Sequence, residues 1–429
     1  MSLNYKTPDY FHDFQCLGGD CPDTCCQHWE VKLDRRHYDL LREKMAQQED
    51  GQALFERHIQ INEQPVTGDH DYAFIRMGED DRCPMLDANA LCRLHAQHGI
   101  EPLGDVCAFY PRVISRCNND MELSGALSCP EVARRCLSSE HPHRLLRFQV
   151  SQLPRSKDYP IQRELPQNPF DYYARDFPAV RQTLLELASR EERPLNARLY
   201  ELITLAHTIS RYYHRDCKTR EQARLERDLA DAREARRQQK IAAFVNADEN
   251  VDPLALLTVR AILTIKIQHF PQERLSRMAA SAFAGDAESL SVEELQQAYK
   301  QRRDAIPESL QKRIDAAFTR YLCNCLFREW YFTMPDSFTC LQMLLIRLAM
   351  LRYLLYGQPR FESLLALHAG AGEQERQRLQ AELDAQLVDL IYNFARGVDQ
   401  NLSFLQLIYT AISEQGMFNF DYSLAFSRF

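Results

Sequence analysis

Residues 16–26 read Cys-Leu-Gly-Gly-Asp-Cys-Pro-Asp-Thr-Cys-Cys, which places cysteines at Cys16, Cys21, Cys25 and Cys26. Gly18 and Gly19 make this loop compliant, so that sulfurs can converge from different directions. The stretch therefore predicts an irregular, cysteine-rich part at the front of the chain.

Three further cysteine motifs follow within the first third of the chain. They are Cys83-Pro-Met-Leu with Leu91-Cys92, then Cys107-Ala-Phe-Tyr-Pro, and Ser128-Cys129-Pro-Glu. Soft thiolates select zinc or iron–sulfur iron over hard cations, and either centre needs about four ligands. The candidate metal ligands are Cys16, Cys21, Cys25, Cys26, Cys83, Cys92 and Cys107, with Cys129 as an eighth.

The sequence does not say which four of these cysteines bind metal. Neighbouring side chains tend to diverge, so Cys25 and Cys26 are not expected to serve together with ease. Cysteines outside the motifs are expected to be small core residues. They are Cys117, Cys136, Cys217, Cys323, Cys325 and Cys340.

Composition indicates a globular, mainly helical chain of two or three domains. The 429 residues are 45% hydrophobic and 26% charged, and only 14 are glycine, about half the usual share of ~7%. The net charge is −8, whereas a dedicated nucleic-acid binder carries an excess of positive charge, so no nucleic-acid partner is expected.

The predicted fold class is mainly α, with a small irregular cysteine-rich α+β domain over residues 1–140 and an all-α multi-helix domain over residues 170–429. Residues 29–33 and 73–77 are predicted strands, and 112–116 with 121–127 a hairpin around Asn118-Asn119-Asp120. Residues 141–169 hold four prolines and are predicted to be a linker. Helices are predicted over 170–189, 193–215, 219–245, 253–268, 291–302, 308–333, 337–356, 374–396 and 399–414.

Neither a secretory signal nor a transmembrane segment is predicted. The most apolar stretch, Leu341 to Leu355, is interrupted by Arg347 and Arg352, whereas a membrane span needs about 20 largely uncharged residues. We expect a buried helix there and a cytoplasmic protein, which leaves association with a membrane surface open.

The cysteine motifs, with Pro8-x-Tyr10 and Cys107-x-x-Tyr-Pro-Arg112, resemble those of the flagellin lysine N-methylase (FliB) family. They are also similar to small proteins described as zinc- or iron-chelating. The FliB resemblance implies methylation of flagellin lysines with S-adenosylmethionine as methyl donor, and an oxygen-sensitive [4Fe-4S] cluster. On this hypothesis the helical domain recognises flagellin. The alternative is a non-enzymatic zinc- or iron-chelating protein whose helical domain is an interaction module.

Catalytic and donor-binding residues remain unassigned. The radical S-adenosylmethionine spacing Cys-x3-Cys-x2-Cys is met by Cys21 and Cys25, but position 28 is His28. The glycines of Gly370-Ala371-Gly372 follow a helical pattern and not a strand, which disfavours a Rossmann-type donor site.

Overall fold

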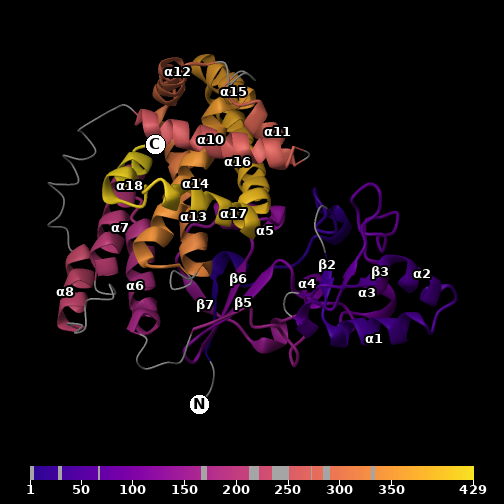
Figure 1. Ribbon diagram of the computed structural model, residues 1–429. Helices are drawn as coiled ribbons and strands as arrows, with labels where there is room; N and C mark the ends of the chain where they lie inside the picture. The colour runs from indigo at the N-terminus through magenta and orange to yellow at the C-terminus, as the bar shows by residue number, and fades with distance from the viewer. Residues whose placement is uncertain are drawn as a thin grey trace. The chain divides into compact units, whose positions relative to one another are not determined.

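The hairpin predicted around Asn118 is present in the computed structural model, at the centre of a five-stranded sheet (Figure 1). The structure describes residues 4–27, 31–65, 68–165, 172–211, 222–233, 251–271, 273–283, 290–329 and 334–429. The chain forms two compact units. Unit 1 comprises residues 1–132 and 145–164, and unit 2 comprises 133–144 and 165–429.

The five-stranded sheet of unit 1 has the order β7-β1-β6-β5-β8. Its strands are β1 (Asn4–Pro8), β5 (Arg112–Cys117), β6 (Asp120–Gly125), β7 (Leu145–Arg147) and β8 (Arg163–Glu164). β5 and β6 pair antiparallel, with Asn118 in the left-handed conformation (φ 55°) at the turn. Parallel pairing of β1 with β6 ties the start of the chain to the hairpin.

The described part of the predicted linker, residues 141–165, contains two strands. β7 and β8 come from this segment and form the two edges of the sheet. Prolines are compatible with short edge strands because such strands leave one side of their backbone unpaired. The prolines at 142, 154 and 160 thus flank strand positions within the sheet of unit 1.

A second, three-stranded sheet has the order β2-β4-β3, formed by β2 (Val31–Leu33), β3 (Ile59–Ile61) and β4 (Ala73–Ile75). The strands predicted at 29–33 and 73–77 are its β2 and β4. The front of the chain also contains five α-helices among its described residues. They are α1 (Arg35–Met45), α2 (Gly51–His58), α3 (Arg93–His98), α4 (Asp105–Phe109) and α5 (Pro130–Leu137), of which α5 runs from unit 1 into unit 2.

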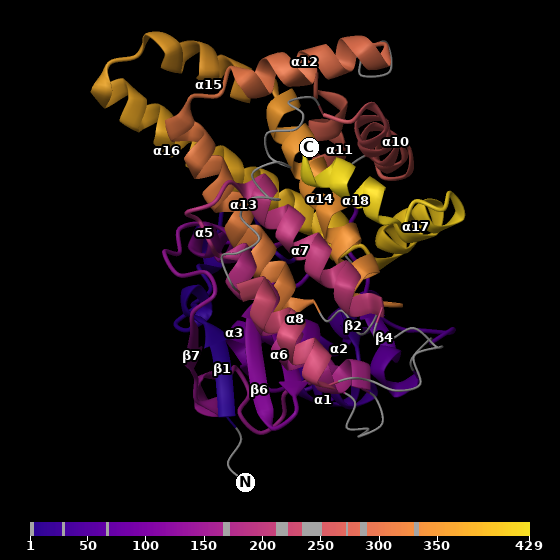
Figure 2. The same ribbon diagram turned by 90° about the vertical axis from the view of Figure 1, so that its left-hand side faces the viewer.

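Among its described residues after 171, the regular elements of unit 2 are all helices. Its helices are α6 (Tyr172–Ala188), α7 (Leu195–Ser210), α8 (Gln222–Arg233), α10 (Pro253–His269), α11 (Arg274–Ala280), α12 (Val292–Asp304), α13 (Glu308–Arg328), α14 (Ser337–Gly357), α15 (Pro359–Gly370), α16 (Glu373–Phe394), α17 (Leu402–Glu414) and α18 (Phe420–Ser427). A π-helical turn, Ala395–Asp399, extends α16. α6, α7 and α8 pack side by side (Figure 2).

The helix predicted over 219–245 is described only at 222–233, and that over 308–333 only to residue 329. Their remaining positions lie outside the described residues, as does Cys217.

Helix α14 is the core of unit 2. It is apolar on all sides, as expected for a helix surrounded by other helices, and it contacts α7, α10, α12, α13, α15, α16 and α18. Asp336 caps its first turn by accepting a hydrogen bond from the Thr339 N–H at 2.7 Å. The helix is long and apolar enough to cross a membrane, but 94% of its apolar window is buried inside the structure. The prediction of a buried helix at this position is confirmed.

A close approach at Gly125 fixes the start of the chain against the hairpin. A Cβ added there would lie 2.6 Å from Phe11 Cδ2 and 2.6 Å from Val132 Cγ1. We expect Gly125→Ala to lower the free energy of unfolding by about 1–3 kcal/mol, the cost typical of overpacking. Urea denaturation measures this change. Gly370→Ala is the control, because a Cβ there meets nothing within 4 Å; equal stability of both variants would contradict the packing argument.

Candidate metal centre

The first cysteine loop turns at its glycines. Residues Gly18–Asp20 form a single 3-10 turn, with Gly18 in the left-handed region (φ 59°). The Gly18 N–H donates to Cys16 Sγ at 3.4 Å, and the Cys21 N–H donates to the Gly18 carbonyl at 3.2 Å. The chain thus turns between Cys16 and Cys21, as expected from the conformational freedom of the two glycines.

The two ends of this loop are held by different parts of unit 1. At the front, the Arg112 guanidinium lies 5.2 Å from the centre of the Phe14 ring, and its Nη2 donates to the Phe14 carbonyl at 3.5 Å. At the far end, the Cys83 N–H donates to the Cys26 carbonyl at 2.8 Å, and Gln27 forms a β-bridge with Arg82. The loop therefore spans from the hairpin to the segment around Cys83.

Cys26, Cys83, Cys92 and Cys107 form the first thiol group. A turn closes where the Leu86 N–H donates to the Cys83 carbonyl at 3.1 Å, and a β-bridge joins Leu86 to Cys92. Cys92 is the residue that precedes α3, and Cys107 lies within α4. Backbone pairing thus connects three of the four cysteines, and the fourth approaches them from α4.

The thiols of the first group act on one another electrostatically. Burial raises the pKa of Cys83 to about 11, and the thiols of Cys26 and Cys92 add to the rise. Part of Cys107 is open to solvent, but desolvation of its thiol, together with charge at Cys26, Cys83 and Cys92, raises its pKa well above the usual range. Charge on one of these thiols thus disfavours charge on the others, and a bound cation would favour their ionised form.

Cys16, Cys21, Cys25 and Cys129 form the second thiol group. Cys129 directly precedes α5, and burial raises its pKa to about 11, with contributions from Cys21 and Cys16. The backbone N–H groups of Glu131 and Val132 act in the opposite direction and favour the thiolate. Cys25 completes the group.

A hydrogen bond from Cys25 to Cys26 joins the two thiol groups. It raises the pKa of Cys25, to which burial and the charges of Cys16 and Cys129 also contribute, and it lowers the pKa of Cys26. The expectation that Cys25 and Cys26 do not both bind metal with ease stays a prediction, because in this structure their side chains contact each other.

The two thiol groups together contain the seven predicted ligands and Cys129; metal binding by these thiols stays a prediction. The donor set fits a thiolate-bound metal, which would deprotonate these thiols on binding. The expected core cysteines Cys117, Cys136, Cys323 and Cys325 are buried. Cys340 is only partly buried and lines a small cavity with Arg181 and Glu329.

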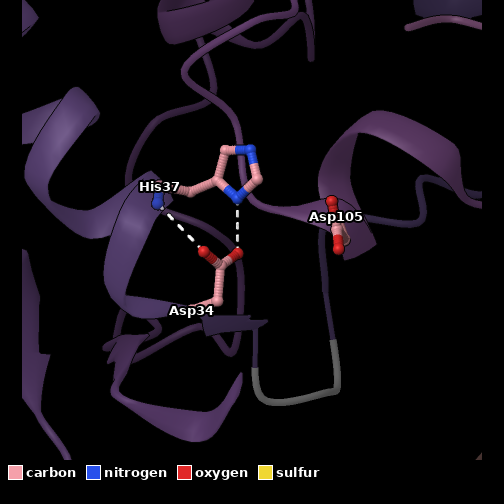
Figure 3. A group of neighbouring side chains, drawn as sticks. All are labelled: Asp34, His37 and Asp105. Carbon is pink, nitrogen blue, oxygen red and sulfur yellow. Dashed lines mark hydrogen bonds and ion pairs between the residues drawn. The ribbon is translucent and has the colours of Figure 1, made fainter. Parts of the chain in front are cut away.

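Among the described residues, the group whose ligand atoms all lie within 4.8 Å of one another is Asp34, His37 and Asp105, and it contains no cysteine (Figure 3). A tetrahedral zinc site with Zn–S bonds of about 2.3 Å places its sulfurs only about 3.8 Å apart. The thiol groups are wider than this. A cluster, in which each cysteine binds a different iron, accommodates wider spacing.

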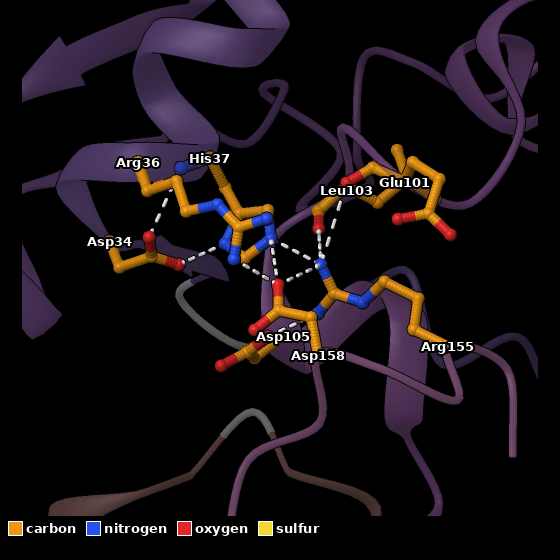
Figure 4. Close-up of polar contacts among 8 residues, drawn as sticks. All are labelled: Asp34, Arg36, His37, Glu101, Leu103, Asp105, Arg155 and Asp158. Carbon is orange, nitrogen blue, oxygen red and sulfur yellow. Dashed lines mark hydrogen bonds and ion pairs between the residues drawn. The ribbon is translucent and has the colours of Figure 1, made fainter.

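The group at His37 is an ion-pair network in which His37 and Arg155 are buried and the carboxylates are partly exposed. Asp34 caps α1 by accepting from the His37 N–H at 3.0 Å and also contacts His37 Nδ1. Burial raises the pKa of Asp34, but these hydrogen bonds outweigh it and lower the pKa. The Arg155 guanidinium contacts His37 Nε2 and Asp105 and donates to the Leu103 carbonyl at 3.3 Å (Figure 4). Arg155 thus supplies the positive charge that a metal would otherwise bring.

This network was not predicted from the sequence. Its local signal is Asp34 at the N-cap of α1, with His37 three residues later. Its decisive member, Arg155, lies 118 residues away from His37 and could not be assigned from spacing.

The family assignment rests on the helical part of the chain. The family model described as the FliB lysine N-methylase C-terminal domain matches residues 181–426, more than half of the chain. The chain belongs to the FliB lysine N-methylase family. The match covers most of unit 2 and begins after the cysteine motifs, so it bears on the helical part and not on the metal ligands.

Similar proteins of Salmonella carry related names. Lysine-N-methylases of Salmonella choleraesuis (strain SC-B67) and Salmonella typhimurium (strain LT2) are each 27% identical over 138 residues, which are 32% of this chain and 33% of each relative. The flagellar biosynthetic protein FliU of Salmonella muenchen is 27% identical over 138 residues, 78% of its length. The matched part thus spans about a third of the lysine-N-methylases. No solved structure matches this FliB-family chain.

Proposed function

We propose that the chain is a protein-lysine N-methyltransferase that transfers methyl groups from S-adenosylmethionine to flagellin. The observation that carries this proposal is the match of residues 181–426 to the lysine N-methylase family. The relatives' names, lysine-N-methylase and flagellar biosynthetic protein, support a flagellar protein as the substrate. The helical unit would then recognise flagellin, and the reaction would take place in the cytoplasm, where thiols stay reduced.

The proposed cofactor is a [4Fe-4S] cluster bound by cysteines of the front part. Cys26, Cys83, Cys92 and Cys107 offer a full set of four soft ligands, and the width of the group favours a cluster over a single zinc ion. Arg82 and Arg93 place positive charge beside these thiols and would favour their ionised form.

The chemistry constrains what the protein must supply. Methyl transfer from a sulfonium to an amine needs a neutral lysine, so its surroundings must lower the pKa of the ammonium group. It also needs the methyl group held in line with the lysine nitrogen. When bound, the cluster could hold the methionine end of the donor at an iron that one of its four thiols has released. Addition of donor to anaerobic protein should then change the cluster's optical spectrum; an unchanged spectrum would indicate a structural cluster.

Anaerobic incubation of the full chain with purified flagellin and S-adenosylmethionine tests the activity. We expect flagellin to gain mass in whole methyl units, read by intact mass spectrometry, and tryptic mapping to place the methyl groups on lysines. Omission of the donor is the control. Unmodified flagellin, together with a colourless protein that carries stoichiometric zinc, would favour the metal-chelating alternative and contradict the proposal.

A further inference from the structure

We propose that unit 1 contains an acid-sensitive switch, in which His37 accepts a hydrogen bond from Arg155 when it is neutral and donates one to Asp158 when it is protonated. Arg155 and Asp158 lie in residues 145–164, the return segment, which belongs to unit 1 but follows residues 133–144 of unit 2. This goes beyond the proposed function and does not depend on methylation, because the hydrogen bonds can be followed in the absence of substrate.

The neutral form of His37 follows from its two hydrogen-bond partners (Figure 4). The Asp34 carboxylate contacts Nδ1, and the Arg155 guanidinium contacts Nε2. A guanidinium has only donors and stays protonated in proteins, so Nε2 must be the acceptor in this contact. The ring is therefore a neutral imidazole that carries its hydrogen on Nδ1 and donates it to Asp34.

Arg155 connects the return segment to the residues that lead into α4. Its side chain is only 1% exposed, and its guanidinium contacts the Asp105 carboxylate and donates to the Leu103 carbonyl at 3.3 Å. The same guanidinium lies 5.1 Å from the centre of the Phe109 ring. The contact between His37 and Arg155 thus joins α1, the start of α4 and the return segment at one buried point.

Charged groups from three elements face the His37 ring. They are Asp34 and Arg36 at the start of α1, Asp105 of α4, and Arg155 and Asp158 of the return segment. The three carboxylates outnumber the two guanidinium groups, so these surroundings tolerate a further positive charge on the ring. Burial opposes ionisation of Asp34, but its hydrogen bonds with His37 lower its pKa, so Asp34 stays ionised while His37 titrates.

Protonation of His37 places a second hydrogen on the ring, at Nε2. This hydrogen would face the N–H groups of Arg155, so two cationic donors would meet and the hydrogen bond between them would be lost. The Asp158 carboxylate can take its place as the partner, because its Oδ2 lies 3.7 Å from His37 Nε2 and 3.9 Å from Arg155 Nη1. Histidine changes charge between about pH 5 and 8, so we expect the exchange of partners in that range.

The acid form should hold the return segment less firmly than the neutral form. The hydrogen bond that is lost belongs to the buried Arg155, whereas Asp158 is 40% exposed and already pairs with Arg36. An exposed ion pair contributes little stability, so the new partner does not replace the buried contact. The contact is therefore present above the pH at which His37 titrates, and it is lost as the pH falls through that value.

Backbone hydrogen exchange of the full chain, read by mass spectrometry between about pH 8 and 5 and corrected for the intrinsic effect of pH, tests the switch. On acidification we expect residues 101–109 and 150–158 to lose protection by about ten-fold, the effect typical of losing one hydrogen bond to a charged group. Hydrogen exchange at the imidazole C2 position in the same samples reports the titration of His37 itself. Its midpoint should coincide with the loss of protection.

Two variants and a control separate the switch from a general effect of acid. His37→Gln supplies an amide oxygen as acceptor and is neutral at every pH, so its protection should not depend on pH. Asp158→Asn removes the anionic partner of the protonated ring, so its transition should move to lower pH. His70→Gln is the matched control, because His70 is exposed in the same unit, and it should behave as the unmodified chain does.

Equal loss of protection on acidification in His37→Gln and in the unmodified chain would overturn the proposal. Unchanged protection of the return segment, in samples whose C2 exchange shows that His37 has titrated, would overturn it as well. This second result comes from the unmodified chain and holds even if His37→Gln does not fold. A His37 ring that stays neutral down to about pH 5 would also contradict the switch.

Discussion

Flagellin incubated with the Cys92→Ser variant should remain unmethylated. The thiol of Cys92 belongs to the first thiol group, and its removal leaves three ligands for the proposed cluster. Changes to residues that only support a metal ligand typically cost 10–100-fold, so loss of a ligand should lower the methylation rate by more than about 100-fold. Intact mass of flagellin after timed anaerobic incubation measures the rate.

The Cys117→Ala variant provides the comparison. Cys117 is buried at the end of β5 and lies outside both thiol groups, so methylation should continue at the unmodified rate. Full activity of Cys92→Ser would contradict a catalytic need for the first thiol group, provided that the variant folds. Circular dichroism and a melting curve establish the fold independently.

The second large effect is expected on stability, at Arg347 in the centre of α14. Its guanidinium binds both oxygens of Glu329, at 2.8 and 2.6 Å, and Asp399 at 3.0 Å. The Tyr321 hydroxyl donates to the same Asp399 carboxylate at 3.0 Å. Arg347→Met would leave the buried Asp399 carboxylate without its ion-pair partner, while Glu329 would keep its contact with Arg328, and this should cost about 3–5 kcal/mol of unfolding free energy.

Urea denaturation measures the effect of Arg347→Met. Arg378→Met is the control, because Arg378 on α16 is 70% exposed in its side chain and forms a surface ion pair with Glu375, three residues earlier on the same helix. A surface pair of this kind should contribute no measurable stability. Equal midpoints for Arg347→Met and the unmodified chain would show that the buried network contributes nothing to the fold of unit 2.

The helical half was predictable because its apolar residues recur with helical spacing over long segments. The short helices α11, α15 and α18 were missed, since a few turns give too little periodicity to stand out. β1 was missed because its pairing partners, β6 and β7, lie more than a hundred residues away. Such pairing depends on tertiary contacts that no local pattern reveals.

The candidate metal centre was predictable in composition but not in arrangement. Cysteine spacing predicted seven candidate ligands and suggested Cys129, yet it could not divide them into groups. That division depends on Phe14 reaching Arg112 and on Cys26 pairing with Cys83, both long-range contacts. The family resemblance was found on the cysteine motifs, whereas the family model matches the helices of residues 181–426.

The most direct test of the account relates methylation to cluster content. Samples of the full chain are stripped by chelation under anaerobic conditions and reconstituted to a series of iron and sulfide contents, and the methylation rate on flagellin is measured for each. The account predicts a rate near zero without iron that rises with cluster occupancy. A full rate in iron-free protein, or in protein that carries only zinc, would contradict it.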